Sequence, residues 1–413
     1  MQKKGLLFVK GDLALNAAHR NTIFLALLVT FIAISIIIYP KEVFGASLRG
    51  LTMWWEIVFP SLLPFFIVSE MLIGLGVVSF IGILLEPFMR PIFRVPGVGG
   101  FVWAMGLASG FPAGAKFTAR LRQEGQLSVI EAERLVSFTN SSNPLFMSGA
   151  IAVGFFGDAA LGLLLMTAHY LGNICVGFIM RFHGKETQKA QPHDYHLPSI
   201  RKAFSALYQT RRREYRPIGK LLGDSVNHSI QTLLMIGGFI IIFSVLNKIL
   251  SVVHIAQSLS YIISLLFIPF HIPTELSLPF LSGLFEITLG SRMASETESS
   301  SLLSQVIITS FILAFSGFSV QAQVASILAD TDIRFQPFFI ARIFHGCFAA
   351  LFTLLFWKPL YIQKQAQEIP VFLNSNPSSL IGEIWLLAIS IGPFITLFSL
   401  LFFIYYQTKS LIK

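Results

Sequence analysis

Apolar runs long enough to cross a lipid bilayer recur along this chain of 413 residues. A hydrocarbon core of about 30 Å needs about 20 consecutive apolar residues in a helix. Hydrophobic residues make up 54% of the sequence and charged residues only 12%, whereas soluble domains average about 25% charged residues. The chain therefore lacks the polar surface of a soluble enzyme, and we expect an all-α polytopic membrane protein.

Eight of these runs are predicted to be transmembrane helices, at residues 22–39, 60–82, 131–156, 159–180, 231–250, 302–328, 337–357 and 384–405. Two further apolar segments, residues 96–115 and 271–290, are dense in Gly, Pro and Ser. Non-helical backbone at membrane depth is tolerated only where it packs in protein or lines a wet cavity. Both segments are therefore predicted to be re-entrant hairpins, and a kinked span or an interfacial helix is the alternative.

The distribution of basic residues predicts the orientation. Lys and Arg number 30 against 21 Asp and Glu, and with the amino terminus inside most of them fall in cytoplasmic segments. We therefore expect a protein of the bacterial cytoplasmic membrane with both termini in the cytoplasm. The basic run Arg-Arg-Arg-Glu-Tyr-Arg at residues 211–216 is interpreted as part of this charge pattern rather than as a lipid or nucleic-acid site, and no nucleic-acid partner is expected.

The two halves of the chain align weakly at an offset of about 172 residues. This offset pairs Ser109-Gly110 with Ser282-Gly283, Ser141 with Ser316, and Cys175 with Cys347. Each half contains three spans and one hairpin, so the second copy enters the membrane from the opposite side. Such an inverted repeat is typical of secondary transporters, which hold the substrate near the midplane.

This duplication predicts five regions. They are a cytoplasmic tail with the first helix (1–45), a first gate-like repeat (46–180), a basic cytoplasmic linker (181–217), a second, inverted repeat (218–358), and an external loop with a last helix (359–413).

Four stretches carry a resemblance to a known family. They are GLASGFPAGAK (106–116), NSSNP (140–144), LSGLFEITLG (281–290) and FSGFSVQAQ (315–323). The chain resembles, over nearly its whole length, the sporulation integral membrane proteins of the YlbJ type, stage V dipicolinate transporters within the nucleoside-recognition or gate-domain group. The resemblance implies export of dipicolinate, a flat pyridine dicarboxylate, from the mother cell across the outer forespore membrane.

The same resemblance implies distant kinship with concentrative nucleoside transporters, whose two hairpins and two unwound helices hold the nucleoside. Those transporters carry a Gln-Thr-Glu cluster on the first hairpin. This chain has Phe111-Pro112-Ala113 there instead, which argues against ribose recognition.

Hairpin tips supply the first set of candidate substrate-binding residues. Exposed N–H groups at half-helix ends can hold a carboxylate, and small residues let the backbone approach a ligand closely. The candidates are Ser109, Gly110 and Gly114 in the first hairpin and Ser282 and Gly283 in the second. The alternative is that these small residues only permit tight helix packing.

Polar breaks inside two apolar spans supply the second set. Asn140, Ser141, Ser142 and Asn143 precede Pro144, and Ser316, Gln321 and Gln323 form the matching break in the other half. A proline removes a helical hydrogen bond, so several short polar side chains gather at one depth. We predict that the two breaks enclose one polar substrate site, and buried packing contacts are the alternative.

Ionisable residues inside predicted spans are costly and are candidates for function. Arg342 could bind one carboxylate of a dianion with its planar fork, or pair with an acid or lie near the interface. Glu286 is a candidate for substrate binding and for proton or ion coupling, and Glu70 for coupling, with a buried hydrogen-bonded acid as the alternative. Lys116 could steer anions or extend to the interface.

His169 and His345 lie on apolar helices and are interpreted as core histidines rather than metal ligands. The sequence contains no HExxH, P-loop or GxSxG motif, so we expect neither an enzyme nor an ATP-driven pump, and no cofactor or metal. It does not select between H⁺ and Na⁺ as a coupling ion.

The resulting hypothesis is a secondary-type transporter for a small anionic aromatic acid, with dipicolinate supplied by the resemblance. The alternatives are a nucleoside or nucleobase transporter, a non-transporting gate-like scaffold needed for spore cortex or spore maturation, and a membrane-embedded enzyme. The expected partners are the substrate, the bilayer, and either a second copy of the chain or other sporulation membrane proteins.

Overall fold

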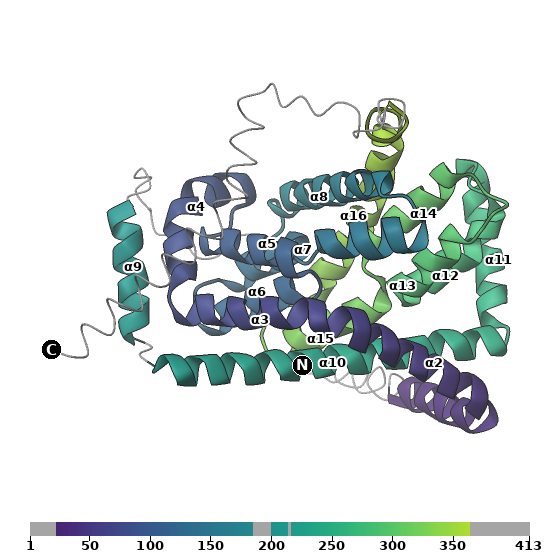
Figure 1. Ribbon diagram of the computed structural model, residues 1–413, viewed down its shortest axis with the longest axis horizontal. Coiled ribbons are helices and arrows are strands. Elements are labelled where there is room, and N and C mark those ends of the chain that lie inside the picture. Colours follow the sequence, from purple (N-terminus) through teal and green to yellow (C-terminus); the bar gives the residue numbers. More distant parts are fainter. Residues whose placement is uncertain (1–21, 185–199, 214–215, 364–413) are drawn as a thin grey trace, which may run out of the picture. The chain divides into compact units, whose positions relative to one another are not determined.

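The computed structural model describes residues 22–184, 200–213 and 216–363, and this part of the chain is built from helices and contains no strand (Figure 1). The chain divides into two compact units, Met1–Tyr361 and Ile362–Lys413. Four helices are long and apolar enough to cross a membrane alone, or up to six spans if each of two bent helix pairs is one. The all-α polytopic class is therefore confirmed. The predicted span at 384–405 lies outside the described residues, so the number eight remains a prediction.

The first half begins with a helix at Thr22–Ile38 and then a longer continuous helix made of α2 (Pro40–Met53), η1 (Trp54–Val58) and α3 (Phe59–Gly74). The sequence predicted a span starting at Pro60, but the helix passes through Pro60 and Pro64 without a stop. The five-residue π-helical turn η1 lies directly before them. Prolines remove main-chain hydrogen bonds, and a π turn is a place where a helix accommodates such a loss.

The span predicted at 60–82 also ends earlier than expected, at Gly74. There the chain bends by 83° into α4 (Val77–Phe93). Gly76 has a φ of 83°, and a Cβ at this position would lie 2.6 Å from the carbonyl oxygen of Leu207. Only glycine fits such a left-handed, crowded turn, so the apolar residues after it form a separate helix.

The first hairpin consists of α5 (Val98–Ser109) and α6 (Ala113–Gln123), two short helices joined by a tight tip at Gly110. The predicted span at 131–156 is broken. Its first part is α7 (Val129–Thr139), which starts at a capping box formed by Ser128 and Glu131. Residues 140–143 are not helical, as predicted, and η2 (Phe146–Phe155) and α8 (Ala160–Met180) follow.

The second half repeats this order of elements. After α9 (Ile200–Arg213) it runs through α10 (Ile218–Val252), α11 (Ile255–Phe267), the 3₁₀ turns η3 (Ile268–Phe270) and η4 (Thr274–Leu276), α12 (Ser277–Phe285), α13 (Ile287–Ser295), α14 (Leu302–Phe315), α15 (Gly317–Ala329), α16 (Phe335–Phe356) and η5 (Trp357–Ile362). Here α12 and α13 form the second hairpin, and α14 and α15 are two parts of one span separated at Ser316.

Corresponding helices of the two halves pack against each other in opposite directions. α10 has 35 residues and lies along the helix Pro40–Gly74, which has the same length (Figure 1). Ala46 meets Ser244, Trp54 meets Leu233, and Gly74 meets Leu221, so the numbering rises on one helix as it falls on the other. An inverted repeat would place corresponding helices in this antiparallel arrangement, and the repeat itself stays a prediction.

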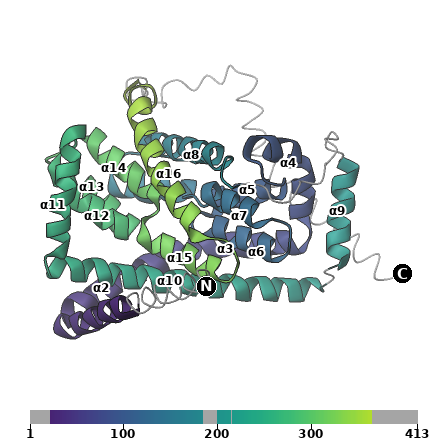
Figure 2. The same cartoon turned by 180° about the vertical axis from the view of Figure 1, so that it is seen from behind.

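The second corresponding pair, α8 and α16, is also antiparallel, since Asn173 contacts Arg342 while His169 contacts His345. α3 lies in front in Figure 1 and α16 in front in Figure 2. The pairing of Cys175 with Cys347 stays a prediction, and the two cysteines lie at similar but not identical positions of their helices. Counted from the start of its helix, Cys175 lies about one turn further along α8 than Cys347 lies along α16.

Candidate functional site

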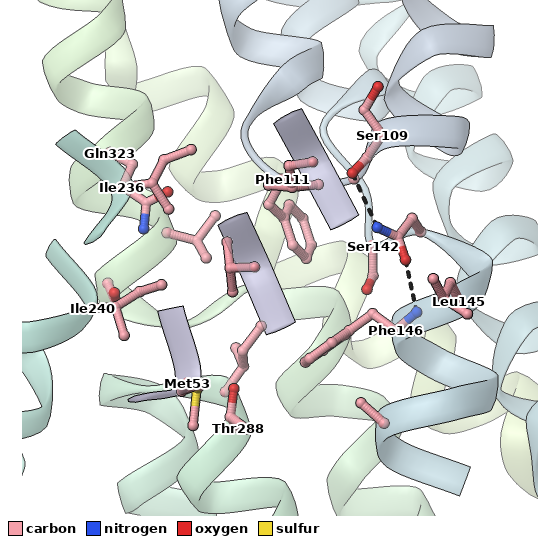
Figure 3. Close-up of a pocket in the computed structure, with 18 of the residues that line it drawn as sticks. Met53, Ser109, Phe111, Ser142, Leu145, Phe146, Ile236, Ile240, Thr288 and Gln323 are labelled. Carbon is pink, nitrogen blue, oxygen red and sulfur yellow. Dashed lines mark hydrogen bonds between the residues drawn. The ribbon is translucent and has the colours of Figure 1, made fainter. Parts of the chain in front are cut away.

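A cavity of about 370 Å³ lies between the two hairpin tips, the first helix break and α15, and the second break at Ser316 does not line it (Figure 3). Six predicted substrate-binding residues line it: Ser109, Gly110, Ser142, Asn143, Glu286 and Gln323. These come from α5 and its tip, the break after α7, the start of α13, and α15. The structure therefore brings together at one site segments that are far apart in the sequence.

Asn143 connects the first hairpin to the first helix break. Its side-chain Nδ2 donates to the carbonyl oxygen of Ser109 at 3.0 Å, and its Oδ1 accepts from the backbone N–H of Phe146 at 2.7 Å (Figure 3). The second bond caps the start of η2, where N–H groups have no helical partner. A Cβ on Gly110 would lie 3.0 Å from the Asn143 amide nitrogen, and the φ of Gly110 is 85°, so glycine is required at this tip.

Glu286 separates α12 from α13 in the second hairpin. Its carboxylate accepts from the backbone N–H groups of Thr288 (3.0 Å) and Leu289 (2.8 Å), so it caps the α13 N-terminus from inside the cavity. Its side chain is buried, with 5% of the residue exposed. A carboxylate is the favoured group at this end of a helix, because the unpaired N–H groups carry partial positive charge.

The second break occurs at Ser316, a serine with a left-handed φ of 69° between α14 and α15. Gln321 does not line the cavity, because its Nε2 turns back to donate to the carbonyl oxygen of Phe315 at 3.0 Å. Ser319 and Gln323 do line it. Their spacing of four residues places both on one face of α15.

The glycine candidates Gly114 and Gly283 lie at helix contacts and not in the cavity lining. A Cβ on Gly114 would lie 2.4 Å from the carbonyl oxygen of Thr139, and one on Gly283 would lie 2.4 Å from the side chain of Ile312. Ser282 is also outside the lining, and its carbonyl oxygen accepts from Asn247 at 3.3 Å. All three residues therefore lie in close helix packing, which was the alternative to substrate binding.

Arg342 is fully buried but does not line the cavity. Its guanidinium donates to the carbonyl oxygens of Asn140, at 2.8 Å, and Ser137, and approaches the side-chain oxygen of Asn173 at 3.4 Å. Ser137 and Asn140 mark the end of α7, where carbonyl groups lack helical partners. Arg342 thus caps the broken helix of the other half, and its positive charge faces the negative end of that helix.

Asn140 and Ser141 lie beside this cap and are buried. Neither the side-chain amide of Asn140 nor the hydroxyl of Ser141 has a hydrogen-bond partner among the described residues. Neither residue lines the cavity.

The two histidines form a buried contact between the halves, with ring centroids 4.5 Å apart. His345 Nδ1 accepts from Arg342 at 3.0 Å and its Nε2 donates to the carbonyl oxygen of His169 at 2.8 Å. His169 Nε2 accepts from the backbone N–H of Ser142 at 3.1 Å, which holds the first break in place. Both act here as hydrogen-bonded core residues.

Glu70 joins α3 to the first hairpin and lies away from the cavity lining. Its carboxylate pairs with Arg120 and, at 3.1 Å, with Lys116, whose ammonium group also lies 4.9 Å from the Phe66 ring centroid. Glu70 is 4% exposed, and two cations compensate its charge. The sequence did not predict this cluster, because its members are about 50 residues apart and only the fold brings them together.

Sequence reasoning also missed the apolar walls of the cavity. Phe111 and Phe146 extend into the space between Gln323, Ile236 and Ile240 on one side and Ser142 on the other (Figure 3). Thr288 completes the polar lining at the start of α13. The one sequence signal for these walls was the four-residue spacing of Ile236 and Ile240 on α10.

Comparison with known proteins shows two matches. Residues 55–159 and 233–331 match the family model Gate, described as nucleoside recognition, and these segments contain both hairpins and both breaks. The chain is 56% identical over 395 residues to the sporulation integral membrane protein YlbJ of Bacillus subtilis (strain 168), covering 94% of this chain and 97% of that protein. No solved structure matches. The chain therefore belongs to the family of the sporulation integral membrane protein YlbJ, and is an integral membrane protein with a nucleoside-recognition gate domain.

Proposed function

We propose that this protein is a secondary-type transporter for a small anionic aromatic acid, and that its substrate is dipicolinate, moved from the mother cell across the outer forespore membrane during sporulation. The observation that carries this proposal is one cavity lined by both hairpin tips, the first helix break and α15, the helix that follows the second break. Secondary transporters bind substrates between broken helices of repeated units, and the antiparallel packing of corresponding helices supports such a repeat.

The chemistry of the cavity suits a flat aromatic ring with polar groups at its edge. Its volume of about 370 Å³ lies within the usual range of about 300–1,000 Å³ for small-molecule sites. Phe111 and Phe146 offer faces for stacking. The hydroxyls of Ser109, Ser142 and Ser319 are buried and have no partner among the described residues, so they are available to donate to a carboxylate.

A nucleoside or nucleobase is the second candidate substrate, favoured by the description of the matching family model. The tip of the first hairpin carries Phe111, Pro112 and Ala113, which offer no side-chain hydrogen-bond donor or acceptor to a ribose hydroxyl. Discrimination for a hydroxyl-bearing ligand depends on such groups. The dicarboxylate therefore fits this hairpin better.

Uptake of radiolabelled dipicolinate into proteoliposomes tests the proposal. We expect uptake by the unaltered protein, at least a tenfold reduction in Ser142→Ala, and unchanged uptake in Ser258→Ala, which removes an exposed hydroxyl on α11. Competition by excess nucleoside would favour the second candidate. Absence of uptake and of ligand binding in folded protein, under proton and sodium gradients of both directions, would favour a scaffold.

A further inference from the structure

We propose that the Glu286 carboxylate is an internal competitor for the substrate: it occupies the N–H groups at the start of α13 that a substrate carboxylate would use, so the dianion binds together with one proton on Glu286. This inference rests on the proposed function and specifies how the same site is regulated. The step is a proton transfer from water to a carboxylate oxygen, and no covalent bond to the substrate forms.

The first observation is the geometry of the carboxylate. Each of its oxygens accepts one backbone N–H group, from Thr288 at 3.0 Å and from Leu289 at 2.8 Å. The residue lines the cavity while being 5% exposed. Backbone N–H groups at a helix start form a ready anion site, and here a side chain of the protein fills it.

The second observation is independent of that helix end. Ser109, Ser142 and Ser319 line the same cavity, are at least 97% buried, and have hydroxyls without a partner among the described residues. They come from the first hairpin and the two broken helices. Buried hydroxyls are normally hydrogen-bonded, so three of them around one cavity indicate a polar ligand.

The third observation concerns charge. Of the described residues that line the cavity, Glu286 alone is ionisable. The elements that pack against α13, namely α12, α14, α15 and η2, contain no ionisable residue. Arg292 of α13 itself pairs with Glu296 at 2.8 Å, and Lys248 of α10 is outside the lining.

These observations together create a conflict that a proton resolves. A dianion beside an ionised Glu286 would place three negative charges in one buried cavity with no cation in its described lining. Repulsion between like charges is strong where water is excluded. A proton on Glu286 removes one charge and weakens its hold on the two N–H groups, which then become available to the substrate.

Equilibrium binding of dipicolinate to the purified full-length chain, measured between about pH 6 and pH 8, tests the inference. Carboxylic acids with an ordinary pKa of about 4, such as those of the free ligand, stay ionised over this range, so their own titration does not change the Kd. If binding takes up one proton, the Kd rises about tenfold for each unit by which the pH is raised. Glu286→Gln keeps the shape without the charge and should bind with a Kd that is independent of pH. Glu275→Gln, which removes an exposed acid from the same hairpin segment, should behave like the unaltered chain.

Proton uptake on binding can also be measured directly, by calorimetry of the unaltered chain in buffers of different ionisation enthalpy, which does not depend on any variant folding. A pH-independent Kd without proton uptake would overturn the inference while leaving the proposed function intact. Binding that instead requires sodium and loses this requirement in Glu286→Gln would also overturn it. Absence of dipicolinate binding at every pH would overturn the proposed function itself.

Discussion

At the scale of single residues, Asn143 connects the first helix break to the tip of the first hairpin, two segments that line the cavity. It caps η2 through Oδ1 and holds the first hairpin through the Ser109 carbonyl. We expect Asn143→Ala to reduce the free energy of unfolding by about 1–3 kcal/mol, because a helix cap and a buried hydrogen bond are lost together. Thermal unfolding in detergent measures this. Asn143→Asp keeps the acceptor and should recover part of the loss, and equal stability of Asn143→Ala and the unaltered chain would contradict the assignment.

Arg342 is the residue whose environment the sequence predicted least well. The sequence identified it as a costly buried charge, but its partners are carbonyl groups at the end of α7, about 200 residues away. We expect Arg342→Ala to destabilise the protein by about 3 kcal/mol or more, because the buried carbonyls lose charged donors. Arg342→Lys should be less damaging. If Arg342 instead binds substrate directly, the folded Lys variant would lose dipicolinate affinity by tenfold or more, which a binding titration would detect.

Asn143 and Arg342 differ in how far their environments could be predicted from the sequence. Polar residues before a proline, as at Asn143, indicate a helix break from local chemistry alone. The partner of a buried charge is set by tertiary packing, as it is for Arg342 and for Glu70 with Arg120. Six lining residues were therefore predictable as polar breaks and tips, whereas Phe111 and Ile236 line the cavity because of how the helices pack.

At the scale of elements, the second hairpin depends on a glycine contact between its two helices. A Cβ on Gly290 of α13 would lie 2.1 Å from the Cα of Gly283 in α12, so the backbones touch with no room for a side chain. We expect Gly290→Ala to separate the helices and to cost about 3 kcal/mol or more, since backbone cannot yield as a flexible side chain does. Gly238→Ala on α10, where nothing lies within 4 Å, is the matched control and should be neutral or slightly stabilising.

Thermal unfolding and dipicolinate binding of both glycine variants check this prediction. A Gly290→Ala protein as stable as Gly238→Ala would show that the two helices tolerate a side chain at their contact.

The errors in the predicted spans also arise from the way helices begin, bend and end. Counting apolar residues finds hydrophobic stretches but does not locate turns, so the bend at Gly76 and the continuation of the helix back to Pro40 were missed.

At the scale of the whole molecule, the two halves are tied together at the loop between α15 and α16. Arg122 of the first hairpin binds Asp332 through two hydrogen bonds of 2.8 and 2.7 Å, and Arg334 binds Glu133 of α7 through two of 2.6 and 2.8 Å. The order of elements in the two halves was foreseeable from the weak repeat. These ion pairs were not foreseeable, because the repeat does not duplicate them. At an offset of about 172 residues, Arg122 corresponds to Ala294 and Glu133 to Gln305, and neither Ala294 nor Gln305 carries a charge.

The two ion pairs should contribute unequally to stability. The Arg122 guanidinium holds the pKa of Asp332 below its ordinary value of 3.8, so this pair stabilises the protein at neutral pH and its contribution is lost as the pH falls below that value. Since the Asp332 side chain is 55% exposed, Asp332→Asn should cost at most about 1 kcal/mol at neutral pH, and less in high salt. Glu133 is buried and also binds His183, so Glu133→Gln should cost about 2–4 kcal/mol.

Thermal unfolding in detergent at low and high salt ranks these variants, with Glu296→Gln as the control because it breaks an exposed pair within one hairpin. The expected order of destabilisation is Glu133→Gln first, then Asp332→Asn, then Glu296→Gln. An Asp332→Asn variant as damaging as Glu133→Gln would mean that the loop position, and not the buried carboxylate, holds the halves together. Under the proposed transport function, in which the two halves would move relative to each other, Asp332→Asn should also change the rate of dipicolinate uptake more than its affinity.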